Sequence, residues 1–420
     1  MSMARRDTAR TMLGASGLTV LGSISPFLLG AQAVLMQRDL GFGPARLGVA
    51  VSVFFGVAAL ATILGVGAFT RLGRRVGLVV AGGLVAIGGL LVATVVQGWW
   101  ALALAMAVLG LANAACQGTA NAAVATALPQ RRRGLGFGIK QSAVPVAIMF
   151  GGLAVPTTTV LLGWRSTFVI IAVVGLVVAL VGATRPAPRA SATARQDNDP
   201  PPDRAPRGPL LLCGAAVTFA SAAANFLGAY LASWAHDVGL TVEQAGLLLA
   251  VGSASSVLVR IAIGHRADRR YGGNLPVVAG MTLAGAVCLA LLGAVPQIWA
   301  VLIFGFLAFA VGWSWPGLLL YAVARLGRDA PTQASSVVQA GAFLGGALGP
   351  ALLGLVVSLL GFAVAWYVAS ASFVLSAVLV VAARRGFRHD LQTRPPAQPF
   401  GYGGGQEQPR YTTRPPDAPM

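Results

Sequence analysis

Apolar runs of about 20 residues recur along the whole chain, and they restrict its fold more than any other feature. A helix of that length crosses the hydrocarbon core of a bilayer, which is roughly 30 Å thick. Hydrophobic residues make up 56% of the 420 residues and charged residues only 10%. Because a soluble protein of this size needs a charged surface, we predict an all-α polytopic membrane protein.

The apolar runs predict twelve transmembrane helices. The first run follows Arg5 and Arg6 and could also be a cleaved signal peptide. We keep it as a span because the internal repeat described below gives it a counterpart in the second half of the chain. The spans begin near Thr11, Ala45, Val76, Trp99, Gly134, Ser166, Leu210, Ala245, Leu275, Ile298, Ala334 and Phe362.

The distribution of basic residues predicts the orientation of these helices. Of the 30 basic residues, only Arg38, Arg46 and Arg165 fall on one side of the predicted topology, which leaves 30 − 3 = 27 in or near the other. Because basic residues mark the cytoplasmic side, we expect a multi-pass protein of the plasma (cytoplasmic) membrane with both termini in the cytoplasm. The net charge of +18 is then a topology signal. A nucleic-acid partner is not expected, because the chain has no basic soluble face.

An internal repeat with a constant offset of 198 residues divides the chain in two. It relates Gly30 to Gly228, Asp39 to Asp237, Gly48 to Gly246, Gln141 to Gln339 and Leu162-Gly163 to Leu360-Gly361. We therefore predict two pseudo-symmetric six-helix bundles, with the substrate bound between them near the midplane. The predicted divisions are a cytoplasmic N-terminus at 1–10, bundles at 11–183 and 210–385, a Pro-rich cytoplasmic linker at 184–209, and a disordered cytoplasmic tail at 386–420.

The sequence shows no pattern typical of an enzyme or a metal site. Cys116, Cys213 and Cys288 are scattered through apolar spans without metal-ligand spacing, and the three histidines lie far apart. There is no nucleophile with a paired base. We predict no enzymatic activity, no metal and no cofactor.

Loop motifs give the chain a resemblance to the major facilitator superfamily over residues 11–385. That family carries Gly-x-x-x-Asp-Arg-x-Gly-Arg-Arg after its second helix, often echoed after the eighth. The resemblance implies a secondary transporter that works by alternating access, which we expect to function as a monomer, and it implies gating roles for the motif residues. These are Gly264, Asp268 and Arg269 in the second copy, and Arg71, Gly73, Arg74 and Arg75 in the first.

Two cations are predicted to lie inside the membrane. If Asp268 ends the eighth span, Arg260 lies about 12 Å deeper, at a depth where arginine is costly and usually functional. The pattern Arg-x-x-x-Gly-x-x-x-Asp also resembles the monocarboxylate, oxalate–formate and cyanate-permease-like branches, where the matching arginine holds the substrate carboxylate. Lys140, the only lysine, is placed about 9 Å deep. Alternatively, Arg260 bonds backbone carbonyls or reaches the interface, and the lysine stem reaches the interface.

Neutral polar residues in the spans could complete a substrate site, although hydrogen bonding between helices explains each of them equally well. All twelve acidic residues fall in loops, tails or span ends. Cations without a buried carboxylate favour a small organic anion as the substrate. The alternative is an exporter of hydrophobic drugs or secondary metabolites, and a receptor or scaffold is a third possibility. The neutral candidates are Gln32, Asn113, Gln117, Asn121, Gln141, Asn225, Tyr230 and Gln339.

The second loop motif also predicts a gate between the two halves. Asp268 ends the eighth span on the predicted cytoplasmic side, where the fifth helix begins. A helix N-terminus carries unpaired N–H groups and a partial positive charge. We therefore expect Asp268 to cap the fifth helix when the cytoplasmic side is closed.

Overall fold

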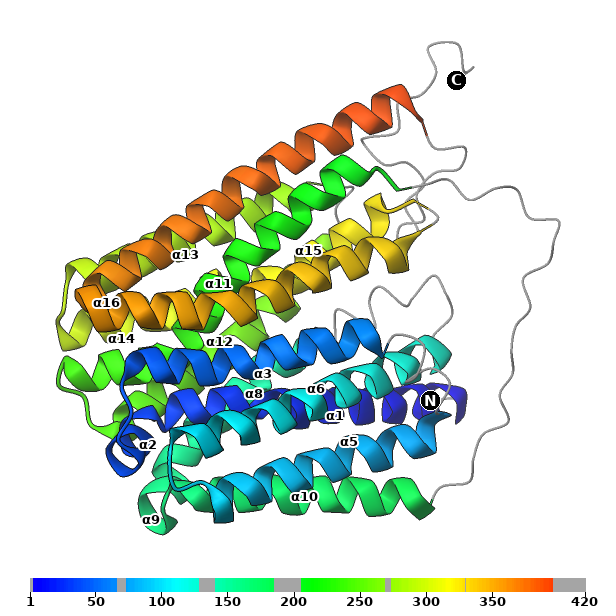
Figure 1. Ribbon diagram of the computed structural model, residues 1–420. Coiled ribbons are helices and arrows are strands. Elements are labelled where there is room, and N and C mark those ends of the chain that lie inside the picture. The colour runs from blue at the N-terminus through cyan, green and yellow to red at the C-terminus, as the bar shows by residue number, and fades with distance from the viewer. Residues whose placement is uncertain are drawn as a thin grey trace.

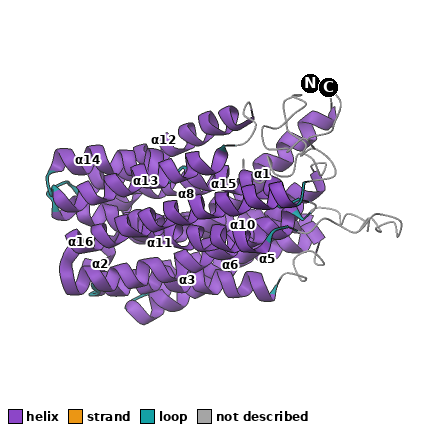
Figure 2. Ribbon diagram, turned by 90° about the horizontal axis from the view of Figure 1, so that it is seen from above, coloured by secondary structure: helices purple, strands orange, loops and turns teal. Residues whose placement is uncertain are grey.

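The computed structural model describes residues 3–65, 73–127, 140–184, 205–268, 273–328 and 330–395, and within these ranges the regular structure is entirely helical (Figure 2). The first half contains α1 (Met3–Ala31), α2 (Ala33–Leu40), α3 (Pro44–Leu64), α5 (Gly73–Leu90), η1 (Leu91–Val95), α6 (Trp99–Ala127), α8 (Ala143–Ala154), η3 (Val155–Thr159), α9 (Val160–Leu162) and α10 (Trp164–Thr184). The second half contains α11 (Arg207–Asp237), α12 (Val242–Asp268), α13 (Asn274–Ala294), α14 (Ile298–Leu307), η4 (Ala308–Gly312), α15 (Trp315–Leu326) and α16 (Pro331–Thr393).

The described helices confirm the prediction of twelve spans. Eleven helical stretches are long and apolar enough to cross a bilayer, and the last of them, Gln333–Thr393, holds two spans. Gly361 divides it, with φ 86° and ψ 170° inside α16. Gly163, its counterpart in the repeat, separates α9 from α10 with φ 81°. Glycine reaches this backbone region without a steric penalty, which explains why both repeats place it between two spans.

Two predicted boundaries differ from the structure. The last helix continues to Thr393, so residues 386–393, predicted to belong to the disordered tail, are helical. The first helix begins at Met3, so the predicted N-terminal segment 1–10 is helical from that residue on. In both places the helix continues past its apolar run, and hydropathy cannot detect the added residues.

The helices run side by side as two bundles, one from each half of the chain (Figure 1). At one end of the molecule, α1 begins, α10 ends, α11 begins and α16 ends; we call this the linker end. At the opposite end, which we call the loop end, α2 turns into α3 and α9 meets α10. Between the bundles, α3 packs extensively against α16, and α8 packs against α12.

Three contacts join residues that the 198-residue repeat relates to each other. Arg38 bonds His236, Gln141 bonds Gln339, and a Cβ on Gly30 would lie 2.7 Å from the carbonyl oxygen of Gly228. Two residues that are related by a two-fold axis can touch only on that axis. These contacts therefore trace the pseudo-two-fold axis from the loop end into the middle of the membrane.

Glycine contacts close the two halves together at the loop end. A Cβ on Gly48 of α3 would overlap the carbonyl oxygen of Pro350 in α16. The related pair behaves similarly, since a Cβ on Gly246 of α12 would lie 2.8 Å from the carbonyl oxygen of Gly152 in α8. Small residues let helices approach this closely without a hydrophobic driving force. The structure is therefore in a state that is closed at the loop end.

Candidate functional site

Arg260 joins the two halves in the interior of the protein. The residue is 8% exposed, and its Nη1 donates to the carbonyl oxygen of Gln141 at 2.9 Å, in the first half. Its Nη2 donates to the carbonyl oxygen of Trp313 at 2.6 Å, in its own half. Both carbonyls lie beside interruptions of their helices, at Ser142 and Ser314. The guanidinium thus satisfies acceptors at helix ends, as the carbonyl-bonding alternative predicted.

Lys140 is also buried, with 3% of the residue exposed. Its Nζ donates to Gln117 Oε1 at 2.5 Å and to Asn121 Oδ1 at 2.6 Å. Both acceptors come from α6, one helical turn apart, and both are neutral amides. The alternative in which the lysine stem reaches the membrane interface does not describe this position.

Gln141 connects these two cations to the opposite bundle. Its Nε2 donates to Gln339 Oε1 at 3.1 Å, across the pseudo-two-fold axis, while its backbone accepts from Arg260. Lys140 precedes it in the chain. We call Gln117, Asn121, Lys140, Gln141, Arg260 and Gln339 the central polar cluster. At 1.5 Å per residue, Arg260 in α12 and Gln117 in α6 each lie about 27 Å from the start of their helix at the loop end.

The remaining predicted polar residues lie outside the cluster's hydrogen bonds. Asn113 is 2% exposed, and its Oδ1 has no partner among the described residues. Asn225 Nδ2 donates to the carbonyl oxygen of Ser221 within α11 at 2.8 Å. Tyr230 is fully buried, and its hydroxyl donates to the carbonyl oxygen of Pro44 at 2.6 Å. Tyr230 therefore ties the halves together near the loop end, away from the position predicted for it in the substrate site.

The predicted gating residues are described only in part. Arg71 and Arg269 lie outside the described residues, and so does the side chain of Asp268, the last residue of α12. Arg74 and Arg75 are exposed in the first turn of α5, which Gly73 opens with φ 70°. Gly264 is exposed in α12, and a Cβ placed there would meet nothing within 4 Å. The gate at Asp268 thus stays a prediction.

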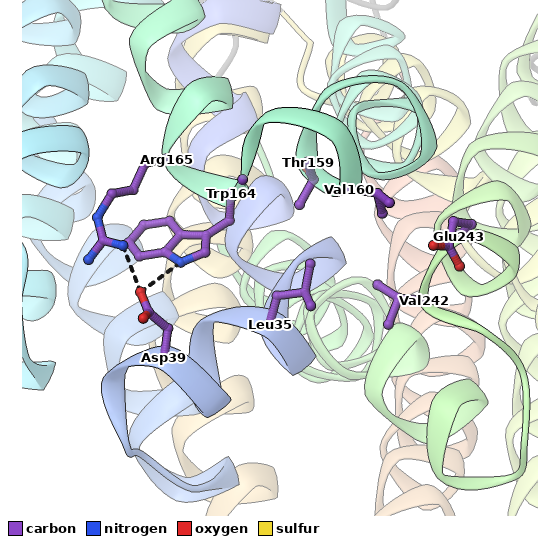
Figure 3. Close-up of a pocket in the computed structure, with 9 residues that line it drawn as sticks. Leu35, Asp39, Thr159, Val160, Trp164, Arg165, Val242 and Glu243 are labelled. Atoms are coloured by element: carbon purple, nitrogen blue, oxygen red, sulfur yellow. Dashed lines mark hydrogen bonds and ion pairs between the residues drawn. The ribbon is translucent and has the colours of Figure 1, made fainter.

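A surface pocket of about 490 Å³ lies at the loop end, between α2, α10 and the start of α12 (Figure 3). Inside it, Asp39 accepts hydrogen bonds from Arg165 Nη1 at 2.7 Å and Trp164 Nε1 at 3.0 Å. The bond from Arg165, with help from Trp164, holds the pKa of the Asp39 carboxyl below its ordinary value. This cluster anchors α2 on α10. It lies well away from the central polar cluster.

The contact between Arg38 and His236 fixes the tautomer of the histidine. His236 Nδ1 lies 2.9 Å from the carbonyl oxygen of Leu240, so this nitrogen carries the proton. Nε2 is then an acceptor for Arg38 Nη2, at 3.0 Å. A protonated imidazole could not accept this bond and would place a second positive charge against Arg38. The other charged neighbour, Asp237, is the next residue in the chain.

We expect the loop end to open more readily when the Arg38–His236 contact is lost. In His236→Leu the side chain offers no acceptor to Arg38 Nη2, and one such bond is worth about 1 kcal/mol. A cysteine introduced by Ser52→Cys, at a half-buried residue that accepts from the Ala351 amide across the halves, reports opening, because the native cysteines are buried. We expect several-fold faster labelling in His236→Leu than in the parent at one fixed pH.

The matched variant is His236→Gln, because the glutamine side chain can still accept from Arg38. This variant should label at the rate of the parent. Labelling of His236→Leu at the same rate as His236→Gln would show that the Arg38–His236 contact does not hold the loop end closed.

Sequence reasoning missed three members of these arrangements, and each left a signal. Arg38 and His236 are separated by the repeat offset of 198, so their meeting on the axis could have been predicted. The Trp313 carbonyl stands in "GWSWPG", where glycine and proline mark a helix interruption that frees an acceptor. Asn121, a neutral candidate from the sequence, follows Gln117 at four residues, on the same face of α6.

Comparison with known proteins finds one family whose sequence model matches both halves of the chain. The sequence model of the Major Facilitator Superfamily matches it twice, over residues 13–212 and 210–409. A chloramphenicol resistance protein from Streptomyces lividans is 33% identical over 256 residues, which is 58% of this chain. The match spans 62% of the length of that relative.

Two solved structures share the fold. A bacterial homologue of the human lysosomal transporter Spinster, in an inward-facing and occupied conformation, superposes with a TM-score of 0.64 and 16% identity, covering 94% of this chain and 98% of that one. A variant of the nucleoside transporter NupG gives a TM-score of 0.67 and 15% identity, covering 90% and 100%. At these identities the likeness concerns the arrangement of the helices and not the substrate.

Proposed function

The chain belongs to the Major Facilitator Superfamily of membrane transporters, and from that premise we propose that it exports a small, uncharged, amphipathic molecule of the drug or secondary-metabolite class. It is a multi-pass secondary transporter and not an enzyme. Of the two substrate classes that the sequence left open, this is the second. The proposal gives the central polar cluster the task of binding the substrate between the halves.

The identity to the chloramphenicol resistance protein carries this proposal. A match of 33% over 256 residues is far stronger than the likeness to either solved structure. Chloramphenicol is uncharged at neutral pH and carries both hydroxyl groups and an amide. It is therefore a suitable first substrate to test.

The chemistry of the cluster supports an uncharged substrate. Both cations already hold neutral oxygen atoms, so neither is poised solely for an anion. Among the described residues, the buried polar atoms without a partner include Asn113 Oδ1, an acceptor, and Arg260 Nε, a donor. A molecule with a hydroxyl or amide N–H and a carbonyl group could satisfy both. A carboxylate group by itself offers acceptors only.

The distribution of basic residues supports export toward the loop end. The three basic residues of the predicted non-cytoplasmic side, Arg38, Arg46 and Arg165, all lie at the loop end. The linker end then faces the cytoplasm under the positive-inside rule. In this orientation the closed loop end blocks access to the site from outside the cell. An exporter needs this closure while its substrate enters from the cytoplasm.

A small organic anion is the second candidate, on a separate observation. Lys140 and Arg260 are both buried, and they donate hydrogen bonds to neutral oxygens. A carboxylate substrate would offset those two charges. It would have to displace carbonyl or amide partners in doing so.

Expression in a chloramphenicol-sensitive host that lacks its own drug exporters tests the proposal. We expect the chain to raise the inhibitory concentration of chloramphenicol several-fold and to lower its accumulation in the cells. The purified protein in liposomes, offered chloramphenicol and a panel of labelled carboxylates, decides between the candidates. Uptake of a carboxylate without any exchange of chloramphenicol would contradict the first proposal and support the second.

A further inference from the structure

The Lys140 amine has two fixed hydrogen-bond partners and one remaining position. Nζ is tetrahedral: one position is its bond to Cε, and two are taken by the bonds to Gln117 Oε1 and Asn121 Oδ1. In the neutral amine the last position is a lone pair, and in the ammonium it is a third N–H. Both forms keep the same two hydrogen bonds. The amine can therefore change its charge while its two hydrogen bonds stay in place.

Acidic residues are sparse in the half of the chain that holds Lys140. Residues 40–196 contain no Asp or Glu, and Asp7 lies near the start of α1, at the linker end. Asp39, just before this stretch, is engaged by Arg165 and Trp164 at the loop end. In the other half, Asp237 and Glu243 lie at the loop end, and Asp268 is the last residue of α12. A carboxylate relay inside the membrane, the usual device for proton coupling, cannot be built from these residues.

The ionisable groups that face Lys140 come from two elements. On α6, the thiol of Cys116 is buried next to Gln117. On α12, Arg260 binds the carbonyl oxygen of Gln141, the next residue after Lys140. The α1 helix, which packs on α8, has no ionisable side chain among residues 11–31. Arginine keeps its charge, whereas a buried lysine changes between charged and neutral forms.

We propose that Lys140 is the proton-binding site that couples transport, and that a proton and a hydrogen-bond donor of the substrate compete for its lone pair. The inference rests on the proposed function, because it assumes an uncharged substrate with a hydroxyl or amide N–H. When the substrate leaves, its group keeps its own proton and frees the lone pair. One proton then binds the amine to form the ammonium, and no other bond changes. The exchange is therefore one proton for one substrate molecule.

The single lysine makes proton binding directly measurable. Protein labelled with ¹³C-lysine gives one Cε resonance, from Lys140, whose position reports the charge of the amine. We expect this resonance to move reversibly between about pH 9 and about pH 6 in the protein without substrate. A resonance that stays fixed over that range would overturn the proposal, whatever the substrate is.

Transport measurements test the coupling. In liposomes containing the wild-type protein, a pH gradient should drive chloramphenicol to at least about tenfold accumulation, and binding should release protons into weakly buffered solution. In Lys140→Gln and Lys140→Arg, chloramphenicol binding, measured at the affinity that each variant retains, should release no protons, and the gradient should drive no accumulation. Arg266→Gln, at an exposed basic residue on α12, is the control and should behave as the wild type.

The outcomes separate the two proposals. Gradient-driven accumulation that is unchanged in Lys140→Gln would overturn the role of Lys140 while leaving the proposed function intact. Absence of any chloramphenicol binding or exchange by the wild type would contradict the proposed function, and the lysine titration would still decide whether Lys140 binds protons.

Discussion

Arg260→Ala is expected to lower transport by at least about tenfold. The guanidinium is the donor to two carbonyl oxygens, of Gln141 and Trp313, and it ties one half of the protein to the other. Its removal leaves both acceptors unpaired next to helix interruptions. A buried polar group that loses its partner costs about 1–3 kcal/mol. A loss of that size in the closed state corresponds to roughly a 5- to 150-fold change in its population.

Arg260→Lys should also impair transport, although less severely. A lysine can supply a charge, but its point-like ammonium cannot span two carbonyls on different helices as a planar fork does. Arg266→Ala is the matched control, because Arg266 is an exposed residue on the same helix. Initial rates of chloramphenicol exchange in liposomes measure all three variants. Transport by Arg260→Ala at the wild-type rate would show that the bridge plays no part in the cycle.

The pattern of spans and the two-fold relation could be predicted from the sequence, because both depend only on which residues stand at which positions in the chain. Hydropathy identifies each crossing, and the 198-residue offset relates Gly163 to Gly361, where positive φ values end one span and begin the next. The depth of Arg260 follows in the same way from the fixed rise of a helix. These features need no knowledge of how the helices pack.

The partners of the buried polar residues could not be predicted, because they depend on how each helix is rotated. In a membrane, lipid and protein interior are both apolar, so the sequence does not mark which face of a helix is buried. Tyr230 and Asn225 lie in an apolar span like the cluster residues, yet Tyr230 bonds Pro44 near the loop end and Asn225 bonds its own helix. Lys140 was placed by depth alone, and its two amide partners on α6 appear only in the structure.

The Arg260 partners illustrate a second limit. The first interpretation of the sequence gave Arg260 a substrate carboxylate as its partner, whereas the guanidinium binds backbone carbonyls beside Ser142 and Ser314, as the alternative had it. Interrupted helices free such acceptors, and only the three-dimensional course of α8 and α15 brings them to one arginine. A cation without a carboxylate therefore did not by itself indicate an anionic substrate.

Gly48→Leu is expected to shift the protein strongly toward the state that is open at the loop end. Any Cβ on Gly48 would overlap the carbonyl oxygen of Pro350, which belongs to the opposite half and cannot rotate away as a side chain can. Overpacking of this kind costs about 1–3 kcal/mol in the closed state, or roughly a 5- to 150-fold shift between the two states. The open state avoids the overlap because α3 and α16 separate there.

The shift is measured by labelling a cysteine introduced by Ser52→Cys, as for His236. Gly56→Leu is the matched control: Gly56 lies two turns further along α3, and a Cβ there would meet only Ala347 Cβ at 3.9 Å. Faster labelling in Gly48→Leu than in Gly56→Leu, with equal thermal stability, would assign the effect to the closure and not to damaged folding. Equal labelling in the two folded variants would mean that the Gly48–Pro350 contact does not control opening. If the glycine contacts do control it, the closed loop end depends chiefly on how closely the helix backbones approach, and the Arg38–His236 contact adds only a smaller bias.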